Sequence, residues 1–203
     1  MPTGRLPLLP VDQAASAAAE VDIIELKAHS CLYRSLLHHP QLAARINDLI
    51  DTLMTDAGLE ARLRELIVLR IGWSNGTVYQ WTHHWRIAQT VGLEERELLA
   101  VRDWEANQDW SPAERAALRA TDETVRNGVI SPSTWDECRR EFPTDAERLA
   151  LVATIGSWKM MSEVLASLEV PLEDGVAPWP PDGMAPGRQH GATSTNEQRQ
   201  EHR

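Results

Sequence analysis

The sequence predicts an all-α protein, and two observations support this prediction. Apolar residues recur three and four positions apart along most of residues 20–173, as they do on one face of an α-helix. Helix-capping signals also divide this region, such as Ser111-Pro112 followed by Glu114. We find no segment with the strict alternation of a β-strand. We therefore expect about seven or eight helices.

The first helices are expected before Gly58. Residues 1–19 are rich in Pro and Ala without a clear period, so we expect an extended N-terminal arm there. Helical spacing begins at Val21 and continues to Leu37, where His38-His39-Pro40 interrupts it, because proline disfavours helix in the residue before it. The spacing resumes over residues 42–54.

Two adjoining helices form the expected centre of the domain. The stretch LEARLRELIVLRIGW, residues 59–73, is apolar enough to be a largely buried helix, and Ser74-Asn75-Gly76 ends it. The next helix continues to Val91 and ends at Gly92. Because a short loop joins them, we expect the two helices to be antiparallel neighbours.

Four more helices are expected in the second half of the chain, over residues 93–104, 111–127, 131–140 and 143–170. From residue 174 the composition shifts to Pro, Gly, Gln, Thr and Arg. We expect residues 174–203 to be disordered, or ordered only by a neighbour, which leaves residues 20–173 as one helical domain.

The charge of the chain excludes several classes of partner. Its 20 basic and 30 acidic residues give a net charge of -10 and a pI near 5.1. Such a balance argues against nucleic acids and anionic membranes as partners, because both require a basic surface. No apolar run approaches the length of a membrane span, and the N-terminus lacks the apolar core of a signal peptide. We therefore expect a cytoplasmic protein.

Neither cysteines nor paired histidines indicate a metal site. Cys31 and Cys138 lie far apart and outside any CxxC motif, so we interpret them as neutral or buried thiols. His83 and His84 are adjacent, and adjacent helical residues point about 100° apart and rarely share one ion. No metal is expected.

A carboxylate and a histidine are expected to face each other across the central helix pair. Glu65 lies 9 residues before Ser74 and His84 lies 10 after it, so both are about equally far from the loop. A carboxylate beside an imidazole fixes the ring tautomer and leaves the second nitrogen to exchange a proton near neutral pH. From spacing alone two alternatives stay open: Glu65 can pair with a nearby arginine, and His84 can be a satisfied interior histidine.

Several neighbours of this pair are candidates for the rest of a site. Tyr79 is a candidate second proton donor or oxyanion anchor. Arg70 can hold a substrate carboxylate, although it can equally be a surface or interface charge. The remaining candidate substrate-binding residues are Trp73, Thr77, Gln80 and Trp81.

Residues 64–93, RELIVLRIGWSNGTVYQWTHHWRIAQTVGL, resemble the carboxymuconolactone decarboxylase-like family, an all-helical group that includes the AhpD-type alkylhydroperoxidases. The flanking segments extend the resemblance to roughly residues 20–174. The resemblance implies an AhpD-like helical bundle. It also implies a homo-oligomer, a trimer or hexamer, with sites near subunit interfaces.

Redox members of that family carry a Glu, a Cys twelve residues on, a second Cys three further and a His four further. Glu65 and His84 match the first and last positions, while Thr77 and Gln80 stand where the cysteines would be. Peroxide reduction in the family needs a thiolate and a resolving thiol. The resemblance therefore implies that this chain keeps only the proton-handling part of the site.

We expect a cofactor-independent lyase-type enzyme that carries out a decarboxylation, elimination or related proton shift. Its substrate would be a small carbonyl- or carboxylate-bearing molecule, with His84 as the acid/base oriented by Glu65. Two alternatives stay open. One is an alkylhydroperoxidase-like antioxidant enzyme that uses Cys31 or Cys138, and the other is a non-catalytic helical oligomer that binds a small molecule or a protein.

Overall fold

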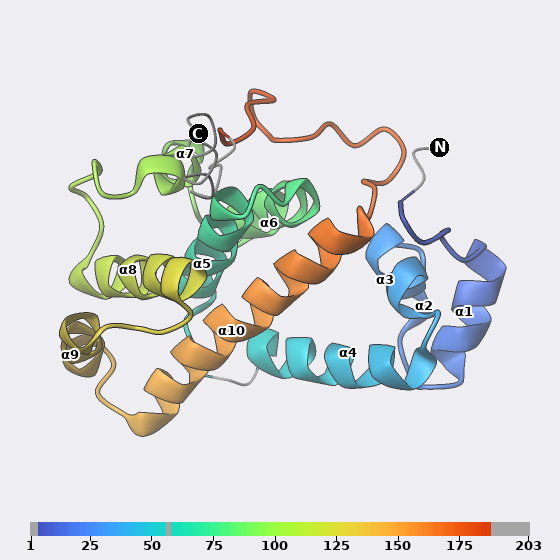
Figure 1. Cartoon of the computed structure of the whole chain (residues 1–203), viewed down its shortest axis with the longest axis horizontal. Coiled ribbons are helices and arrows are strands. Elements are labelled where there is room, and N and C mark those ends of the chain that lie inside the picture. Colours follow the sequence, from blue (N-terminus) through green and yellow to red (C-terminus); the bar gives the residue numbers. More distant parts are fainter. Residues whose placement is uncertain (1–3, 56–57, 188–203) are drawn as a thin grey trace, which may run out of the picture.

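The computed structural model describes residues 4–55 and 58–187, which fold into ten α-helices and one short 3-10 helix without any strand (Figure 1). This confirms the predicted all-α class. The elements are α1 (Val11–Ala19), α2 (Glu25–Ala28), α3 (Cys31–Leu36), α4 (Pro40–Thr55), α5 (Ala61–Ser74), α6 (Val78–Thr90), α7 (Glu95–Ala100), η1 (Val101–Asp103), α8 (Pro112–Asn127), α9 (Pro132–Glu141) and α10 (Asp145–Leu168).

The number of helices exceeds the predicted seven or eight because the N-terminal third is divided more finely. Residues 1–19 were predicted to be extended, and this was wrong for residues 11–19, which form α1. Alanine is the best helix former, and the i, i+4 pair Ala14 and Ala18 is completely buried against the helices that follow. The helix expected from Val21 is also split, because Ser30 caps the start of α3 by accepting the backbone N–H of Tyr33.

Helices α5 and α6 form the expected antiparallel pair at the centre of the molecule (Figure 1). They approach closely at Gly72, where an added Cβ would lie 3.1 Å from the backbone nitrogen of Trp81. Gly76 makes the turn between them with a φ of +66°, a left-handed conformation that favours glycine. The register of the pair is therefore fixed by backbone contact as well as by side chains.

Helix α10 crosses this pair and contributes side chains to more than one apolar cluster of the core (Figure 1). One apolar cluster lies between α5, α8, α9 and α10, and another lies among α1 to α4 and is closed by Met161 of α10. We expected no apolar run of membrane-spanning length, but α10 meets that criterion by length and composition. Its Leu151 and Ile155 are fully buried inside the bundle, as in the core helix of a globular domain.

The segment after α10 continues along α6 towards α7 (Figure 1). We predicted residues 174–203 to be disordered or ordered only by a neighbour, and this was wrong for residues 174–187. Within them, Trp179 donates its backbone N–H to Thr82, the carbonyl of Pro180 accepts the indole N–H of Trp81, and Asp182 pairs with Arg102. Residues 188–203, the rest of the predicted tail, lie outside the described residues.

Candidate active site

Glu65 of α5 and His84 of α6 lie side by side in the interior. The His84 Nδ1 is 2.7 Å from Oε2 of Glu65, whose side chain is completely buried. The other carboxylate oxygen, Oε1, accepts a 3.2 Å hydrogen bond from the guanidinium of Arg64, which is itself buried. The charge of Arg64 therefore compensates the buried carboxylate behind the histidine.

The second ring nitrogen of His84 defines its tautomer. The indole N–H of Trp158 in α10 donates to Nε2 of His84 over 3.3 Å. An indole nitrogen can only donate, so Nε2 must be the accepting nitrogen and the proton of the neutral ring lies on Nδ1. His84 therefore donates to Glu65 and presents a basic nitrogen towards Trp158.

His84 and Trp158 both line a cavity of about 300 Å³, here called the histidine cavity. Its walls come from α2, the start of α3, α4, α6 and α10. The walls are mainly apolar, with contributions from Leu32, Ile50, Met54, Ile87, Met161 and Leu165. A small organic molecule with an apolar body fits such a space.

Tyr79 also lines the histidine cavity, but its hydroxyl is already bonded. It donates to Oε1 of Glu173 at 2.8 Å and accepts the backbone N–H of Leu32 at 3.3 Å. Burial and the neighbouring Glu173 raise the pKa of Tyr79, so the phenol stays protonated. Its role as a second proton donor, expected from the sequence, would require it to exchange the Glu173 bond for one to a substrate.

The two positions that carry cysteine in redox members of the family have separate surroundings here. The Thr77 hydroxyl lies 2.6 Å from the hydroxyl of Ser162, outside the histidine cavity. Gln80 lines the cavity and donates to the carbonyl of Val68 over 2.8 Å. Its Oε1 is buried and has no partner among the described residues.

Trp73 and Trp81, two of the predicted substrate-binding residues, lie away from the histidine cavity. Trp73 and Trp81 pack on each other with ring centroids 5.1 Å apart, and Arg102 lies 4.6 Å and 5.3 Å from the two rings. Both tryptophan rings contact Trp179 of the C-terminal segment, so they stabilise the packing of this segment on the bundle.

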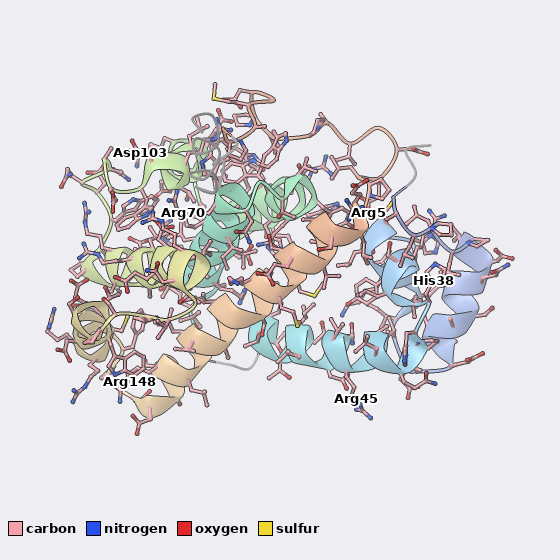
Figure 2. The ribbon with its side chains drawn as sticks, in the orientation of Figure 1. Arg5, His38, Arg45, Arg70, Asp103 and Arg148 are labelled. Atoms are coloured by element: carbon pink, nitrogen blue, oxygen red, sulfur yellow. The ribbon has the colours of Figure 1, made fainter. Side chains whose placement is uncertain are left out.

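Arg70 lies on the side of α5 that faces α8 (Figure 2). Its guanidinium donates two hydrogen bonds to Asp122, of 2.6 Å and 2.8 Å, and two more to the carbonyls of Val101 and Arg102. These bonds leave Arg70 no role as a carboxylate anchor in the histidine cavity. The spacing pattern identified the helix but not the direction of this side chain.

The structure adds a second histidine–glutamate pair that sequence reasoning missed. His83 lines the same cavity, and its Nε2 lies 2.7 Å from Oε2 of Glu173. Adjacent helical residues diverge too far to share an ion, but a wide cavity can be bordered by both. Glu173 is the last residue of the predicted helical domain and lies beyond its last helix, so no helical spacing pointed to it.

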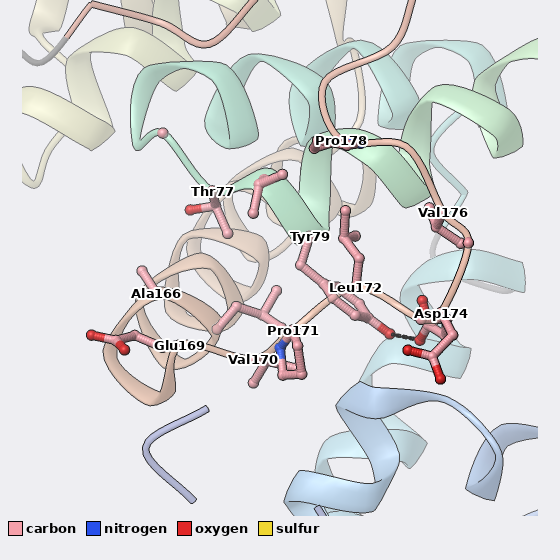
Figure 3. A pocket seen from close by; sticks show the side chains of 15 residues that line it. Thr77, Tyr79, Ala166, Glu169, Val170, Pro171, Leu172, Asp174, Val176 and Pro178 are labelled. Atoms are coloured by element: carbon pink, nitrogen blue, oxygen red, sulfur yellow. Dashed lines mark hydrogen bonds between the residues drawn. The ribbon is translucent and has the colours of Figure 1, made fainter. Parts of the chain in front are cut away.

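A second hollow of about 670 Å³ lies on the other side of Tyr79 (Figure 3). It is bordered by Gly76 to Tyr79, by the end of α10 and by residues 169–178. Figure 3 shows the Tyr79 hydroxyl bonded to the C-terminal segment between Leu172 and Asp174. Tyr79 and Leu165 line both hollows and form the wall between them.

Both cysteines are free and buried, and neither lines the histidine cavity. Burial raises the pKa of Cys138 to about 11. Burial and the negative charge of Glu173 also raise the pKa of Cys31. Neither thiol is therefore in a setting that generates a thiolate at neutral pH.

Comparison with known proteins agrees with this architecture. Residues 40–123, which include Glu65 and His84, match the model of the carboxymuconolactone decarboxylase family. The comparison with curated proteins gave no match.

Solved structures share the fold at low sequence identity. A peroxidase-related protein with an alkylhydroperoxidase AhpD core from Ralstonia eutropha JMP134 is 18% identical, with a TM-score of 0.68 over 86% of this chain and 94% of that one. A peroxidase-related protein from Silicibacter sp. TM1040 is 12% identical, with a TM-score of 0.68 over 87% and 92%. The debrominase Bmp8 is 15% identical, with a TM-score of 0.62 over 81% and 86%. The predicted AhpD-like fold and the predicted resemblance to the carboxymuconolactone decarboxylase family are thus confirmed.

Proposed function

We propose that the protein is a lyase-type enzyme that moves a proton on a small carbonyl- or carboxylate-bearing molecule, with His84 as the acid/base. One observation carries the proposal. A fully buried glutamate holds Nδ1 of His84, and His84 lines a cavity of substrate size. A histidine needed only for packing does not require a buried carboxylate partner beside a cavity.

The proposed step begins when Nε2 of His84 takes a proton from carbon next to a carbonyl group. The C–H bond breaks, and its electron pair either forms an enolate or expels a leaving group from the neighbouring carbon. His84 is then an imidazolium, which the carboxylate of Glu65 stabilises through the Nδ1–H bond. In the opposite direction the imidazolium returns its proton to carbon, as the last step of a decarboxylation requires.

Trp158 has a defined part in this step. Its N–H can bond to Nε2 only while that nitrogen is unprotonated. The bond therefore breaks when Nε2 takes up a proton. The freed indole N–H can then turn to a substrate oxygen.

The antioxidant alternative has weaker support. Two structural neighbours are described as peroxidase-related, but thiol-dependent peroxide reduction needs a reactive thiolate. Cys31 and Cys138 are buried, their pKa values are raised, and Thr77 and Gln80 replace the sulfur positions of redox relatives. The homo-oligomeric state and the cytoplasmic location stay predictions.

Deuterium labelling tests the proposed proton transfer without knowledge of the substrate. Purified protein is incubated with an extract of small metabolites in D₂O, and mass spectrometry identifies compounds that gain deuterium on carbon or are consumed. His84→Gln should lower the labelling rate by a factor of roughly 10² or more. His29→Gln, which changes an exposed histidine, should have no effect. Undiminished labelling by a His84→Gln protein with a normal melting temperature would overturn the proposal.

A further inference from the structure

Two histidines border one cavity, and each is held by a glutamate from a different part of the chain. His84 is bonded to Glu65 and His83 to Glu173, and each nitrogen–oxygen distance is 2.7 Å. We propose that His83, held by Glu173, binds an anionic oxygen of the substrate, a carboxylate or developing enolate, while His84 moves the proton. The part concerning His84 rests on the proposed function, but anion binding by His83 does not.

Glu173 holds the His83 ring in a defined position. Its Oε2 bonds to the imidazole, while its Oε1 accepts the backbone N–H of Cys31 at 2.9 Å and the hydroxyl of Tyr79 at 2.8 Å. The ring of Tyr79 stacks on that of His83, with centroids 4.2 Å apart and an interplanar angle of 29°. The imidazole is thus fixed at its edge and on one face.

Glu173 places a negative charge beside the His83 ring. Burial tends to raise the pKa of Glu173, but the hydrogen bonds from His83, the Cys31 N–H and Tyr79 outweigh it and hold that pKa at about 2. Glu173 is therefore an anion at neutral pH, and an anion bonded to an imidazole stabilises the imidazolium.

An imidazolium at position 83 has one N–H to offer a ligand. Its Nε2–H is used by Glu173, and no group among the described residues bonds to its Nδ1. The His83 side chain is 31% exposed and borders the cavity. The other cation on the cavity wall, Lys27, is already bonded to Asn47 and both oxygens of Asp51. The Nδ1–H of a protonated His83 would thus be a donor on this wall that no described residue occupies.

The two histidines therefore have opposite hydrogen-bonding character. Nε2 of His84 accepts the indole N–H of Trp158, whereas His83 beside the Glu173 anion is a donor. This combination suits a substrate with an acidic C–H and a nearby carboxylate or carbonyl oxygen, attached to an apolar body small enough for 300 Å³.

Calorimetric titration of the full chain with benzoate tests the anion site, with benzyl alcohol as a neutral probe of similar size. Wild-type protein should bind benzoate at pH 6 more tightly than benzyl alcohol. His83→Gln should weaken benzoate binding at least tenfold, because a charge-assisted hydrogen bond is lost, and should change benzyl alcohol binding less than twofold. His29→Gln, the exposed-histidine control, should leave both unchanged. Equal benzoate affinity in wild type and His83→Gln, or no preference of wild type for benzoate, would overturn the proposal.

The pH dependence provides a test if His83→Gln does not fold. Benzoate affinity should fall as pH rises through the histidine range, and in Glu173→Gln the fall should begin at lower pH. Glu173 and Tyr79 contact the His83 ring, while Lys27 with Asp51, and His84 with Glu65, border the same cavity. The titration is therefore repeated in His84→Gln, where the same fall should persist, and its disappearance there would contradict the role of His83. Neither experiment measures turnover, so failure here is separate from failure of proton transfer by His84.

Discussion

At the residue scale, the buried carboxylate of Glu65 positions a second residue, His84. Its side chain has no exposed surface, and its two oxygens are divided between Arg64 and His84. Burying a carboxylate costs free energy unless all its hydrogen bonds are made. We therefore interpret Glu65 as a residue that positions His84 rather than one that stabilises the fold. His84 gains a fixed tautomer from it.

Glu65→Gln tests this dependence. The amide keeps the shape but leaves the buried guanidinium of Arg64 without its anion, so the free energy of unfolding should fall by about 3 kcal/mol. Glu97→Gln is the matched control, because Arg62 is more exposed and keeps Glu114 as a second partner. That control should lose at most about 1 kcal/mol in urea denaturation. Equal losses in both variants would show that removal of the Glu65 carboxylate does not leave the charge of Arg64 uncompensated.

The thiols provide a second prediction at this scale. Cys31 and Cys138 should react slowly with a thiol reagent at pH 7 in the folded protein and rapidly after denaturation, because both are buried with raised pKa values. Treatment with peroxide should leave both titratable. Rapid loss of one thiol in the folded protein would support the antioxidant alternative.

At the scale of elements, the α5–α6 pair depends on close backbone approach. Gly72 is the contact point, and a methyl group there would press against the backbone of Trp81 at 3.1 Å. Because backbone cannot move aside as a flexible side chain can, the two helices must separate or tilt. Glu65 and His84 lie on the same two helices, so their distance depends on this contact.

Gly72→Ala should therefore lower the free energy of unfolding by about 1–3 kcal/mol, measured by urea denaturation. Gly156→Ala in α10 is the control, because an added Cβ there meets nothing within 4 Å. It should raise stability by about 0.5–1 kcal/mol through helix propensity. If the two variants changed stability in the same direction, the Gly72 contact would not limit the approach of α5 and α6.

The same pair shows what could be predicted from sequence. Counting residues from the loop placed Glu65 opposite His84, because a helical hairpin has a fixed rise per residue. Counting could not find that Trp81 and Arg70 face away from the cavity, since that depends on where α8 and the C-terminal segment pack. Helix α1 was missed because its apolar face consists of alanines, which give little periodic contrast.

At the scale of the whole molecule, the C-terminal segment connects distant parts of the fold. Glu173 reaches α3 and α6, Trp179 packs on the tryptophans of α5 and α6, and Asp182 pairs with Arg102 after α7. Its Pro- and Gly-rich composition predicted disorder. That prediction failed because composition does not show which residues of the bundle the segment can bond to. The order of residues 174–187 comes from bonds to the bundle.

Acid should weaken this connection over a defined range. The pKa of Glu173 in the folded protein, about 2, lies below its ordinary value of 4.5. The stabilisation is therefore complete above pH 4.5 and is lost as pH falls towards 2. Between these limits wild type should lose on the order of 2 kcal/mol more than Glu173→Gln, after allowance for partial exposure. Thermal melting of both proteins at stepped pH measures the difference, and parallel curves would contradict the assigned bonds.

The central claim is that the neutral His84 ring carries its proton on Nδ1, bonded to Glu65, which leaves Nε2 as the basic nitrogen. Nitrogen-15 NMR of protein labelled in its histidines measures this directly, with the His84 signals assigned by His84→Gln. The predicted result for the neutral ring is a proton on Nδ1. A proton on Nε2 of the neutral ring would contradict the claim, because His84 could then accept neither the Trp158 hydrogen bond nor a substrate proton at the cavity.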